Sequence, residues 1–329
     1  FGASGGGGNA GCIGCVCVNP TSTVPLGKGS GYTSPSNGVP SGDAFDIDYV
    51  AHELGHQFGA NHTFSMSNEG TGANMEPGSG STIMGYAGIT SQDVQLNSDP
   101  YFHAISIQQV TNNIKTKTCP TLTATGNAIP TANAGLDFTI PKSTPFMLTG
   151  SGTDANGDAL TYIWEQFDNA SSAQTGASSA ASATKTSGPT FRSYSPSTST
   201  SRYFPRMQSV LTGATTTSGS EIVVEALPSV ARTMNFRFTT TIFCLLVSAQ
   251  FLLAQASHNA LVYEGNKRFD AKEYDASSSK YLEAIAVKND SYTAHYNLGN
   301  ALYKSKKYEE ASAEYSKAQK YTKSKFEKA

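Results

Sequence analysis

The feature that most constrains this chain is the string H-E-L-G-H-Q-F-G-A-N-H, which runs from His52 to His62. His52 and His56 are four residues apart, so a helix would place both imidazoles on one face, where they could bind the same metal ion. Gly59 would let the chain leave that helix in a sharp turn, because glycine adopts backbone conformations that other residues rarely adopt. His62 could then approach the same ion from another direction, with Glu53 beside the water on that ion.

Three neutral imidazoles leave one position of a tetrahedral zinc ion open for water, which is the arrangement of a catalytic rather than a structural site. Half of the 6 histidines of the chain fall in this one register. A surface amphipathic helix with incidental histidines would not need that register. We therefore predict one catalytic zinc ion held by His52, His56 and His62, with Glu53 as the catalytic base.

The chain combines two compositions. Residues 1–233 contain 29 of the 31 glycines, with 9 basic and 15 acidic residues, a net charge of −6. Residues 234–329 contain 14 basic and 10 acidic residues, a net charge of +4. The first composition is typical of secreted β-rich proteins and the second of helical repeats. The net charge of −2 for the whole chain gives no indication of nucleic-acid binding.

Apolar spacing predicts one helix from Asp43 to Ala60 and another from Tyr101 to Lys115. Residues 19–42 and 65–82 are rich in Gly and Ser and are predicted to be loops. A short strand is expected to end at Val18. Further strands are predicted at Asp137–Ile140, Phe146–Leu148, Leu160–Trp164, near 208–211 and at 221–227.

The string from His52 to His62 resembles the signature of the metzincin metalloproteases, and I-M-G-Y at Ile83–Tyr86 is similar to the Met-turn of that family. The resemblance implies that Met84 forms an apolar floor beneath the zinc ligands. It also implies that Tyr86 contacts the metal or the oxyanion, although a simple packing role stays open for this tyrosine. The implied activity is peptide hydrolysis by a zinc-activated water.

The wider string from Asp43 to Phe64 resembles the reprolysin-like proteases secreted by Gram-negative bacteria. Adamalysin-type reprolysins have Asp after the third histidine, where this chain has Thr63, so the subfamily stays open, with pappalysin-like enzymes as neighbours. The resemblance covers roughly residues 10–120 of a predicted α+β catalytic domain at 1–120. It corresponds to the later part of a metzincin domain, in which Cys12–Val18 could be the edge strand that binds substrate. We therefore expect a fragment, which could be inactive.

Four cysteines lie in the first part of the chain: Cys12, Cys15, Cys17 and Cys119. Their spacing could indicate a metal site, but a disulfide is favoured in an exported protein. We expect Cys119 to be bonded to one of the early cysteines, and the sequence does not say which.

After a predicted linker at 121–129, residues 130–236 resemble the immunoglobulin-like or PKD-like accessory domains of bacterial secreted enzymes. This resemblance implies an all-β sandwich with Trp164 in its core. Asp154, Asn156 and Asp158 could bind Ca²⁺ through oxygen ligands. The same string, D-A-N-G-D, is typical of a β-turn, and we favour the turn.

Residues 242–256 form an apolar run that is shorter than the roughly 20 residues needed to cross a bilayer as a helix. Because the run ends in A-Q-A, residues 237–256 resemble a signal peptide. We hypothesise that two unrelated reading frames are joined between 234 and 241. The sequence leaves open whether the C-terminal segment is a natural fusion or an assembly artefact. Contact with a membrane is expected only if the run at 242–256 is not cleaved.

Residues 257–329 carry a 34-residue period, in which Gly265 corresponds to Gly299 and Tyr281 to Tyr315. This period resembles about two tetratricopeptide repeats, which implies all-α helical hairpins and a protein partner.

The sequence thus predicts a multidomain zinc endopeptidase, secreted or on the cell surface, that acts on protein or peptide substrates. One alternative is a non-catalytic interaction or scaffold protein that acts through its repeats. Another is a binding module that retains zinc without turnover.

Overall fold

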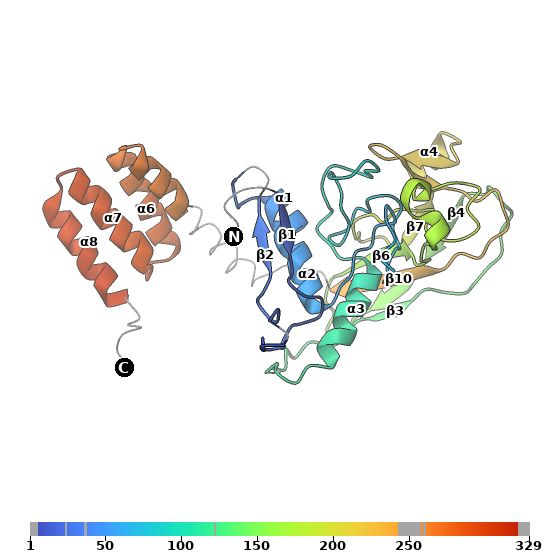
Figure 1. Ribbon diagram of the computed structural model, residues 1–329, viewed down its shortest axis with the longest axis horizontal. Coiled ribbons are helices and arrows are strands. Elements are labelled where there is room, and N and C mark those ends of the chain that lie inside the picture. The colour runs from blue at the N-terminus through green and yellow to red at the C-terminus, as the bar shows by residue number, and fades with distance from the viewer. Residues whose placement is uncertain are drawn as a thin grey trace. The chain divides into compact units, whose positions relative to one another are not determined.

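The computed structural model describes residues 6–23, 25–35, 38–121, 123–242, 258 and 261–321. The chain divides into two compact units, Phe1–Phe243 and Cys244–Ala329, which we call the first unit and the helical unit (Figure 1). Apart from Ile242, the apolar run at 242–256 lies outside the described residues. Within the described ranges, no helix is long and apolar enough to cross a membrane.

The described residues up to position 120 form two short strands and two helical segments. Their elements are β1 (Gly7–Asn9), β2 (Tyr32–Ser34), α1 (Asp43–Phe45), the π-helix η1 (Asp46–Ala51), α2 (His52–Phe58) and α3 (Ala104–Lys115). Both predicted helices are therefore present. The second begins at Ala104 rather than Tyr101, because the His103 side chain accepts a hydrogen bond from the backbone N–H of Ile105 and caps the helix.

The regular elements in the rest of the first unit are mainly short strands in antiparallel pairs. Its elements are β3 (Thr131–Asn133), β4 (Phe146–Thr149), β5 (Ser151–Thr153), β6 (Leu160–Gln166), η2 (Ser172–Gln174), η3 (Gly176–Ser178), β7 (Ser201–Phe204), α4 (Met207–Leu211), β8 (Thr216–Ser218), β9 (Val223–Ala226) and β10 (Phe236–Ile242). The pairs are β3 with β5, β4 with β7, β6 with β10 and β8 with β9, and β1 pairs with β2.

A buried apolar cluster lies among these strands. Its members are Leu148, Trp164, Phe191, Phe204, Leu227 and Phe238. Trp164 contributes its ring to the cluster and donates its indole N–H to the carbonyl of Thr200 at 3.0 Å, so its polar atom is satisfied as well. The domain boundaries at 121–129 and the sandwich fold itself stay predictions.

Two of the strands predicted in this region are absent. Residues 137–140 form no strand, since the run has no partner strand and Phe138 is exposed. Residues 208–211 belong to the helix α4, because a short apolar run cannot be assigned to strand or helix by its pattern alone. The predicted end of the β domain at 236 stays a prediction. The strand β10 continues to Ile242, pairing along β6 from Phe236 opposite Gln166 to Ile242 opposite Leu160.

The helical unit contains α6 (Tyr274–Val287), α7 (Tyr292–Lys304) and α8 (Tyr308–Tyr321), and residues 261–270 are also helical. The hydroxyl of Tyr281 donates to Asn266 at 2.7 Å, and that of Tyr315 donates to Asn300 at 2.8 Å. The two residues of the first hydrogen bond recur 34 residues later as those of the second, so the predicted period repeats contacts as well as residue types. The helical hairpins are confirmed.

Candidate metal centre

The segment that carries His52 and His56 is a continuous helical run from Asp43 to Phe58. Asp43 lies in its first turn, where a carboxylate interacts favourably with the helix dipole. The run ends at Gly59, whose φ of 113° is in the region that favours glycine. The backbone N–H of Gly59 donates to the carbonyl of His56, and that of Ala60 to Gly55, both at 2.9 Å. This turn returns the chain toward the helix.

The turn brings His62 next to His52 and His56. One ring nitrogen from each of the three imidazoles can be chosen so that all lie within 4.8 Å of one another. Nε2 of His56 and Nε2 of His62 are 3.0 Å apart. His52 and His56 are buried, whereas His62 is half-buried. The three residues predicted to bind one ion are therefore brought together.

The other ring nitrogen of each histidine has a hydrogen-bond acceptor. Nδ1 of His52 donates to the carbonyl of Ile83 at 2.7 Å, and Nδ1 of His56 to that of Ala60 at 2.8 Å. Nδ1 of His62 faces the carboxylate of Glu69 at 2.9 Å. A proton on Nδ1 leaves Nε2 with a lone pair, so the Nε2 atoms of His56 and His62 present two acceptors to each other. A shared cation removes that repulsion, so the arrangement fits a metal ion.

Burial favours the neutral form of these imidazoles. It lowers the pKa of His52 to about 3, with the nearby His56 and His62 adding to the effect. Burial likewise lowers the pKa of His62 to about 3, with a further contribution from His56. Because metal ions bind the neutral ring, the site is ready to bind one at neutral pH without first losing protons.

Glu53 lies one residue after His52, and burial raises its pKa to about 7. Its side chain lies against β1, so closely that a Cβ atom added to Gly8 would overlap its carboxylate. Glu53 also lines an open groove of about 330 Å³ with Val16, Tyr32, Leu54, Val50 and Phe58 among its walls. The apolar face predicted for the first helix is thus partly exposed at this groove.

Met84 and Tyr86 lie on the turn that follows residue 80. Met84 is fully buried, and its sulfur lies so close to Gly55 that a Cβ atom there would overlap it. Its carbonyl accepts the backbone N–H of Thr63 at 3.0 Å, which connects the turn to the residue after His62. The ring of Tyr86 lies 4.6 Å from that of His62 and 5.4 Å from that of His52, centroid to centroid. Burial raises the pKa of Tyr86, as do the nearby Glu69 and Glu53.

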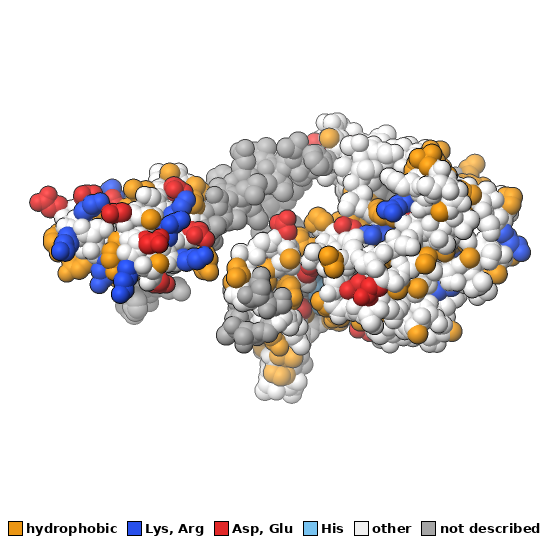
Figure 2. All heavy atoms as spheres, turned by 90° about the horizontal axis from the view of Figure 1, so that it is seen from above, with side chains coloured by type: hydrophobic (Ala, Val, Ile, Leu, Met, Phe, Trp, Pro, Cys, Tyr) orange, Lys and Arg blue, Asp and Glu red, His pale blue; other side chains and the backbone are white. Residues whose placement is uncertain are grey.

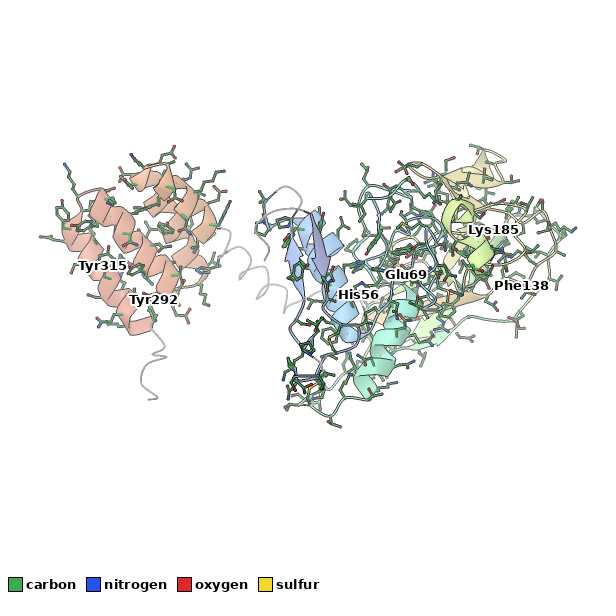
Figure 3. All side chains as sticks on the ribbon, viewed as in Figure 1. His56, Glu69, Phe138, Lys185, Tyr292 and Tyr315 are labelled. Atoms are coloured by element: carbon green, nitrogen blue, oxygen red, sulfur yellow. A yellow bond between two sulfur atoms is a disulfide. The ribbon has the colours of Figure 1, made fainter. Side chains whose placement is uncertain are left out.

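Two carboxylates near the site were not predicted from the sequence. Glu69 faces His62, as described above, and Figure 3 shows it on the loop beside the labelled His56 of α2. Glu76 is buried and accepts the hydroxyl of Thr63 at 2.6 Å. A carboxylate thus reaches the residue after the third histidine from another loop. No local signal marked either residue, because both lie in a Gly/Ser-rich loop whose irregular path, rather than a regular spacing, brings them to their partners.

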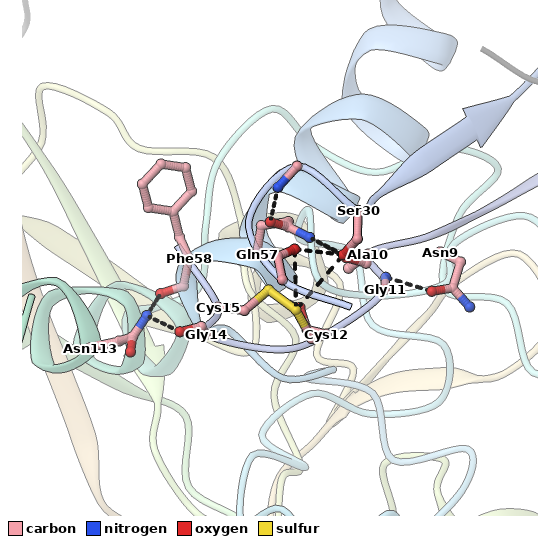
Figure 4. The surroundings of a disulfide bond; sticks show 12 residues. Asn9, Ala10, Gly11, Cys12, Gly14, Cys15, Ser30, Gln57, Phe58 and Asn113 are labelled. Carbon is pink, nitrogen blue, oxygen red and sulfur yellow. Dashed lines mark hydrogen bonds between the residues drawn. A yellow bond between two sulfur atoms is a disulfide. The ribbon is translucent and has the colours of Figure 1, made fainter. Parts of the chain in front are cut away.

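The four cysteines form two disulfides, Cys17–Cys119 and Cys12–Cys15. The strand predicted to end at Val18, over Cys12–Val18, is wrong. These residues form bends and turns around the Cys12–Cys15 bond (Figure 4). The strand near Glu53 is instead Gly7–Asn9. The N–H of Gly14 donates to the carbonyl of His56 at 2.8 Å, which satisfies a carbonyl in the last turn of α2.

The candidate calcium residues form a turn. Oδ1 of Asp154 accepts the backbone N–H groups of Asn156 at 2.8 Å and of Asp158 at 3.1 Å. Oδ1 of Asn156 accepts the N–H of Ala128 at 2.5 Å. These oxygens serve backbone donors, which agrees with the turn that the sequence favoured.

Comparison with known families gives matches at both ends of the chain. Residues 1–118 match the family model described as "Metallo-peptidase family M12B Reprolysin-like". Residues 265–306 match "TPR repeat" and residues 292–324 match "Tetratricopeptide repeat". No curated protein matches the chain significantly. The N-terminal segment is therefore similar to a metallopeptidase family and the C-terminal segment to tetratricopeptide repeats.

Proposed function

We propose that the first unit is a zinc-dependent endopeptidase. The observation that carries this proposal is the convergence of His52, His56 and His62 within 4.8 Å, with Glu53 on the helix α2 that also carries His52 and His56. The match of residues 1–118 to a metallopeptidase family supports it.

In this proposal, His52, His56 and His62 hold the zinc ion through Nε2. When bound, zinc supplies a Lewis acid that lowers the pKa of water and polarises the scissile carbonyl. Glu53 accepts a proton from the attacking water as its oxygen bonds to the carbonyl carbon, and then delivers that proton to the leaving amine as the C–N bond breaks. Tyr86, whose ring lies beside those of His52 and His62, donates a hydrogen bond to the developing oxyanion.

The edge of β1 beside Glu53 suits an extended peptide as substrate. The groove with Val16, Leu54 and Phe58 on its wall belongs to another face of the helix, since none of the three histidines lines it. The strand β1 runs past the carboxylate of Glu53, so its backbone could pair with a peptide that lies along it.

A peptidase assay on the full chain, with a chelator and then with zinc restored, tests the activity. Glu53→Gln should reduce the rate by about 10²- to 10⁴-fold, because the amide cannot accept the proton, and should leave zinc bound. Asp46→Asn is the matched control, since Asp46 is an exposed carboxylate on the same helical run. Cleavage that survives the chelator, or survives in Glu53→Gln, would exclude the mechanism.

The same experiment separates the alternatives. If the unaltered chain retains zinc but cleaves nothing, the first unit is a binding module. If the chain neither binds zinc nor cleaves, the function belongs to the tetratricopeptide segment, whose matches to repeat families support a protein partner. A partner of that segment should bind Glu53→Gln as well as the unaltered chain.

We also propose that the first unit works outside the cytoplasm, on the cell surface or secreted. The disulfides Cys12–Cys15 and Cys17–Cys119 support this location, because such bonds persist in oxidising compartments. Alkylation of the native protein followed by mass spectrometry tests it. Modification of these cysteines without prior reduction would contradict the proposal.

A further inference from the structure

The third histidine is held differently from the other two. His52 and His56 donate Nδ1–H to backbone carbonyls, whose position follows from the path of the chain. His62 instead faces a side-chain carboxylate, with Nδ1 at 3.0 Å from Oε1 and 2.9 Å from Oε2 of Glu69. Only at His62 does the orientation of the imidazole depend on a second side chain.

Glu69 is presented by a loop that is closed at its base. The loop runs from Phe64 to Asn74, and the Asn74 side-chain amide donates to the carbonyls of Phe64 at 2.5 Å and Ser67 at 3.0 Å. Near its tip, Oδ1 of Asn68 accepts the N–H of Gly70 at 2.9 Å. These bonds fix the path of the backbone on both sides of Glu69.

The base of this loop is also bound to the segment that follows β6. The N–H of Asn74 donates to Oδ1 of Asn169, and the N–H of Ala170 donates to the carbonyl of Asn74, both at 2.9 Å. Asn74 itself is buried. The position of Glu69 is therefore set by the packed body of the first unit rather than by an isolated surface loop.

We infer that Glu69 is a positioning residue for metal binding, which holds His62 in the orientation and tautomer that direct Nε2 toward the shared metal position. The inference rests on the proposed zinc site. A carboxylate that accepts Nδ1–H fixes the ring and makes Nε2 a better donor to a metal, and loss of such a partner typically costs about 10- to 100-fold in metal affinity.

The alternative is an ordinary surface ion pair. The side chain of Glu69 is 38% exposed, and exposed pairs usually contribute little to stability. The two roles give different results, because an ion pair would affect folding slightly and metal affinity not at all. Its partner His62 is only 14% exposed, which limits access of water to the bond.

The test is the zinc dissociation constant of the full chain, measured by competition with a chromogenic chelator. Glu69→Ala should weaken zinc binding by about 10- to 100-fold. Glu69→Gln should weaken it less, because the amide oxygen can still accept Nδ1–H but carries no charge. Asp46→Asn, which removes the same charge from an exposed carboxylate on the helical run, should leave the constant unchanged.

A second readout is the visible absorption spectrum with Co²⁺ in place of zinc, which reports the geometry of the ligands. We expect Glu69→Ala to alter this spectrum and Asp46→Asn to leave it unaltered. Zinc affinity in Glu69→Ala equal to that of the unaltered chain, or an equal loss in Asp46→Asn, would overturn the inference. If Glu69→Ala fails to fold, the affinity and spectrum of Glu69→Gln decide the question in the same way.

The outcomes for the two proposals are distinguishable. If the unaltered chain binds no zinc, the proposed function fails. If it binds zinc and Glu69→Ala binds equally well, the proposed function stands and only the role of Glu69 is lost.

Discussion

Each of the two compact units is stabilised internally by a different kind of interaction. In the first unit, residues 59–103, all of which the structure describes, contain no helix or extended strand. Buried polar side chains hold this stretch in place. They include Thr63, Ser65, Asn74, Glu76, Ser79, Ser81 and Thr82. The candidate metal centre is built on a framework of specific hydrogen bonds, each with its own geometry.

The helical unit is held mainly by repeated packing. Gly265 and Gly299 each lie against a tyrosine ring, that of Tyr281 or Tyr315, so closely that a Cβ atom at either glycine would overlap it. Charged side chains of both signs cover the surface of this unit in Figure 2, whereas the visible face of the first unit carries fewer. Among the described residues of the helical unit, no lysine is buried.

The contrast predicts how each unit responds to substitution. Loss of one buried acceptor in the first unit leaves several donors without partners, and each unpaired buried group has its own cost. A change in the helical unit alters one contact among several equivalent ones. The chain also supplies separate probes: Trp164, its single tryptophan, lies in the core of the first unit, so its fluorescence reports that unit alone.

The largest effect is expected at Glu76. Its carboxylate accepts the hydroxyls of Thr63 at 2.6 Å and Thr82 at 2.5 Å, and the backbone N–H of Ser81 at 2.9 Å. Glu76→Ala leaves these buried donors unpaired and should destabilise the first unit by about 3 kcal/mol or more. Urea unfolding followed by the fluorescence of Trp164 measures the loss.

The control is Asp137→Ala, which removes an exposed carboxylate from the same unit. Far-ultraviolet circular dichroism, to which the long helices contribute most, should show the transition of the helical unit unchanged in both variants. If the midpoint of urea unfolding, followed by fluorescence, is the same in Glu76→Ala as in Asp137→Ala, the buried hydrogen bonds of Glu76 do not stabilise the first unit.

A smaller effect is expected in the helical unit at Gly299. A Cβ atom there would lie 2.6 Å from the nearest ring atom of Tyr315, so Gly299→Ala forces the helices apart. Overpacking of this kind costs about 1–3 kcal/mol, and the better helix propensity of alanine offsets up to about 1 kcal/mol. Circular dichroism should show a lower midpoint, with the fluorescence transition unchanged. Ser312→Ala, on the exposed face of α8, is the control, and a midpoint raised by Gly299→Ala would contradict the packing argument.

The same contrast explains which parts of the fold could be predicted from the sequence. The spacing of His52, His56 and His62 depends on one helix and one glycine turn, so local rules place these residues together, and their role as ligands stays a prediction. The 34-residue period was equally visible, because the same letters make the same contacts twice.

The unpredicted parts depend on contacts that no regular spacing positions. Glu69 and Glu76 reach their partners through the irregular path of a loop, and nothing in the surrounding Gly/Ser-rich sequence distinguishes them from solvated carboxylates. The strand expected at 137–140 has a suitable alternation but no partner strand, and strand pairing is decided by the fold as a whole. Likewise, the strand β10 overlaps the proposed junction at 234–241, and no local pattern indicated that it pairs with β6. The junction of two reading frames stays a hypothesis, which sequencing of the genomic DNA across it would test.

An effect that depends on pH is expected from a buried cation in the first unit, which has no counterpart among the described lysines of the helical unit. Lys185 is buried, its ammonium donates to the carbonyl of Ser179 at 3.1 Å, and burial, with the nearby Arg232, lowers the pKa of Lys185 from 10.5 to about 8. Between these values the unfolded chain holds a proton that the folded chain has lost, so the stability of the first unit gains a contribution that grows as pH rises through this window. Lys185→Met should remove that contribution, whereas Lys142→Met, at an exposed lysine, should retain it. Midpoints of urea unfolding at pH values of about 8 and 10, read from Trp164 fluorescence, compare the two variants. An equal change of midpoint with pH in both would show that Lys185 is charged in the folded protein throughout this range.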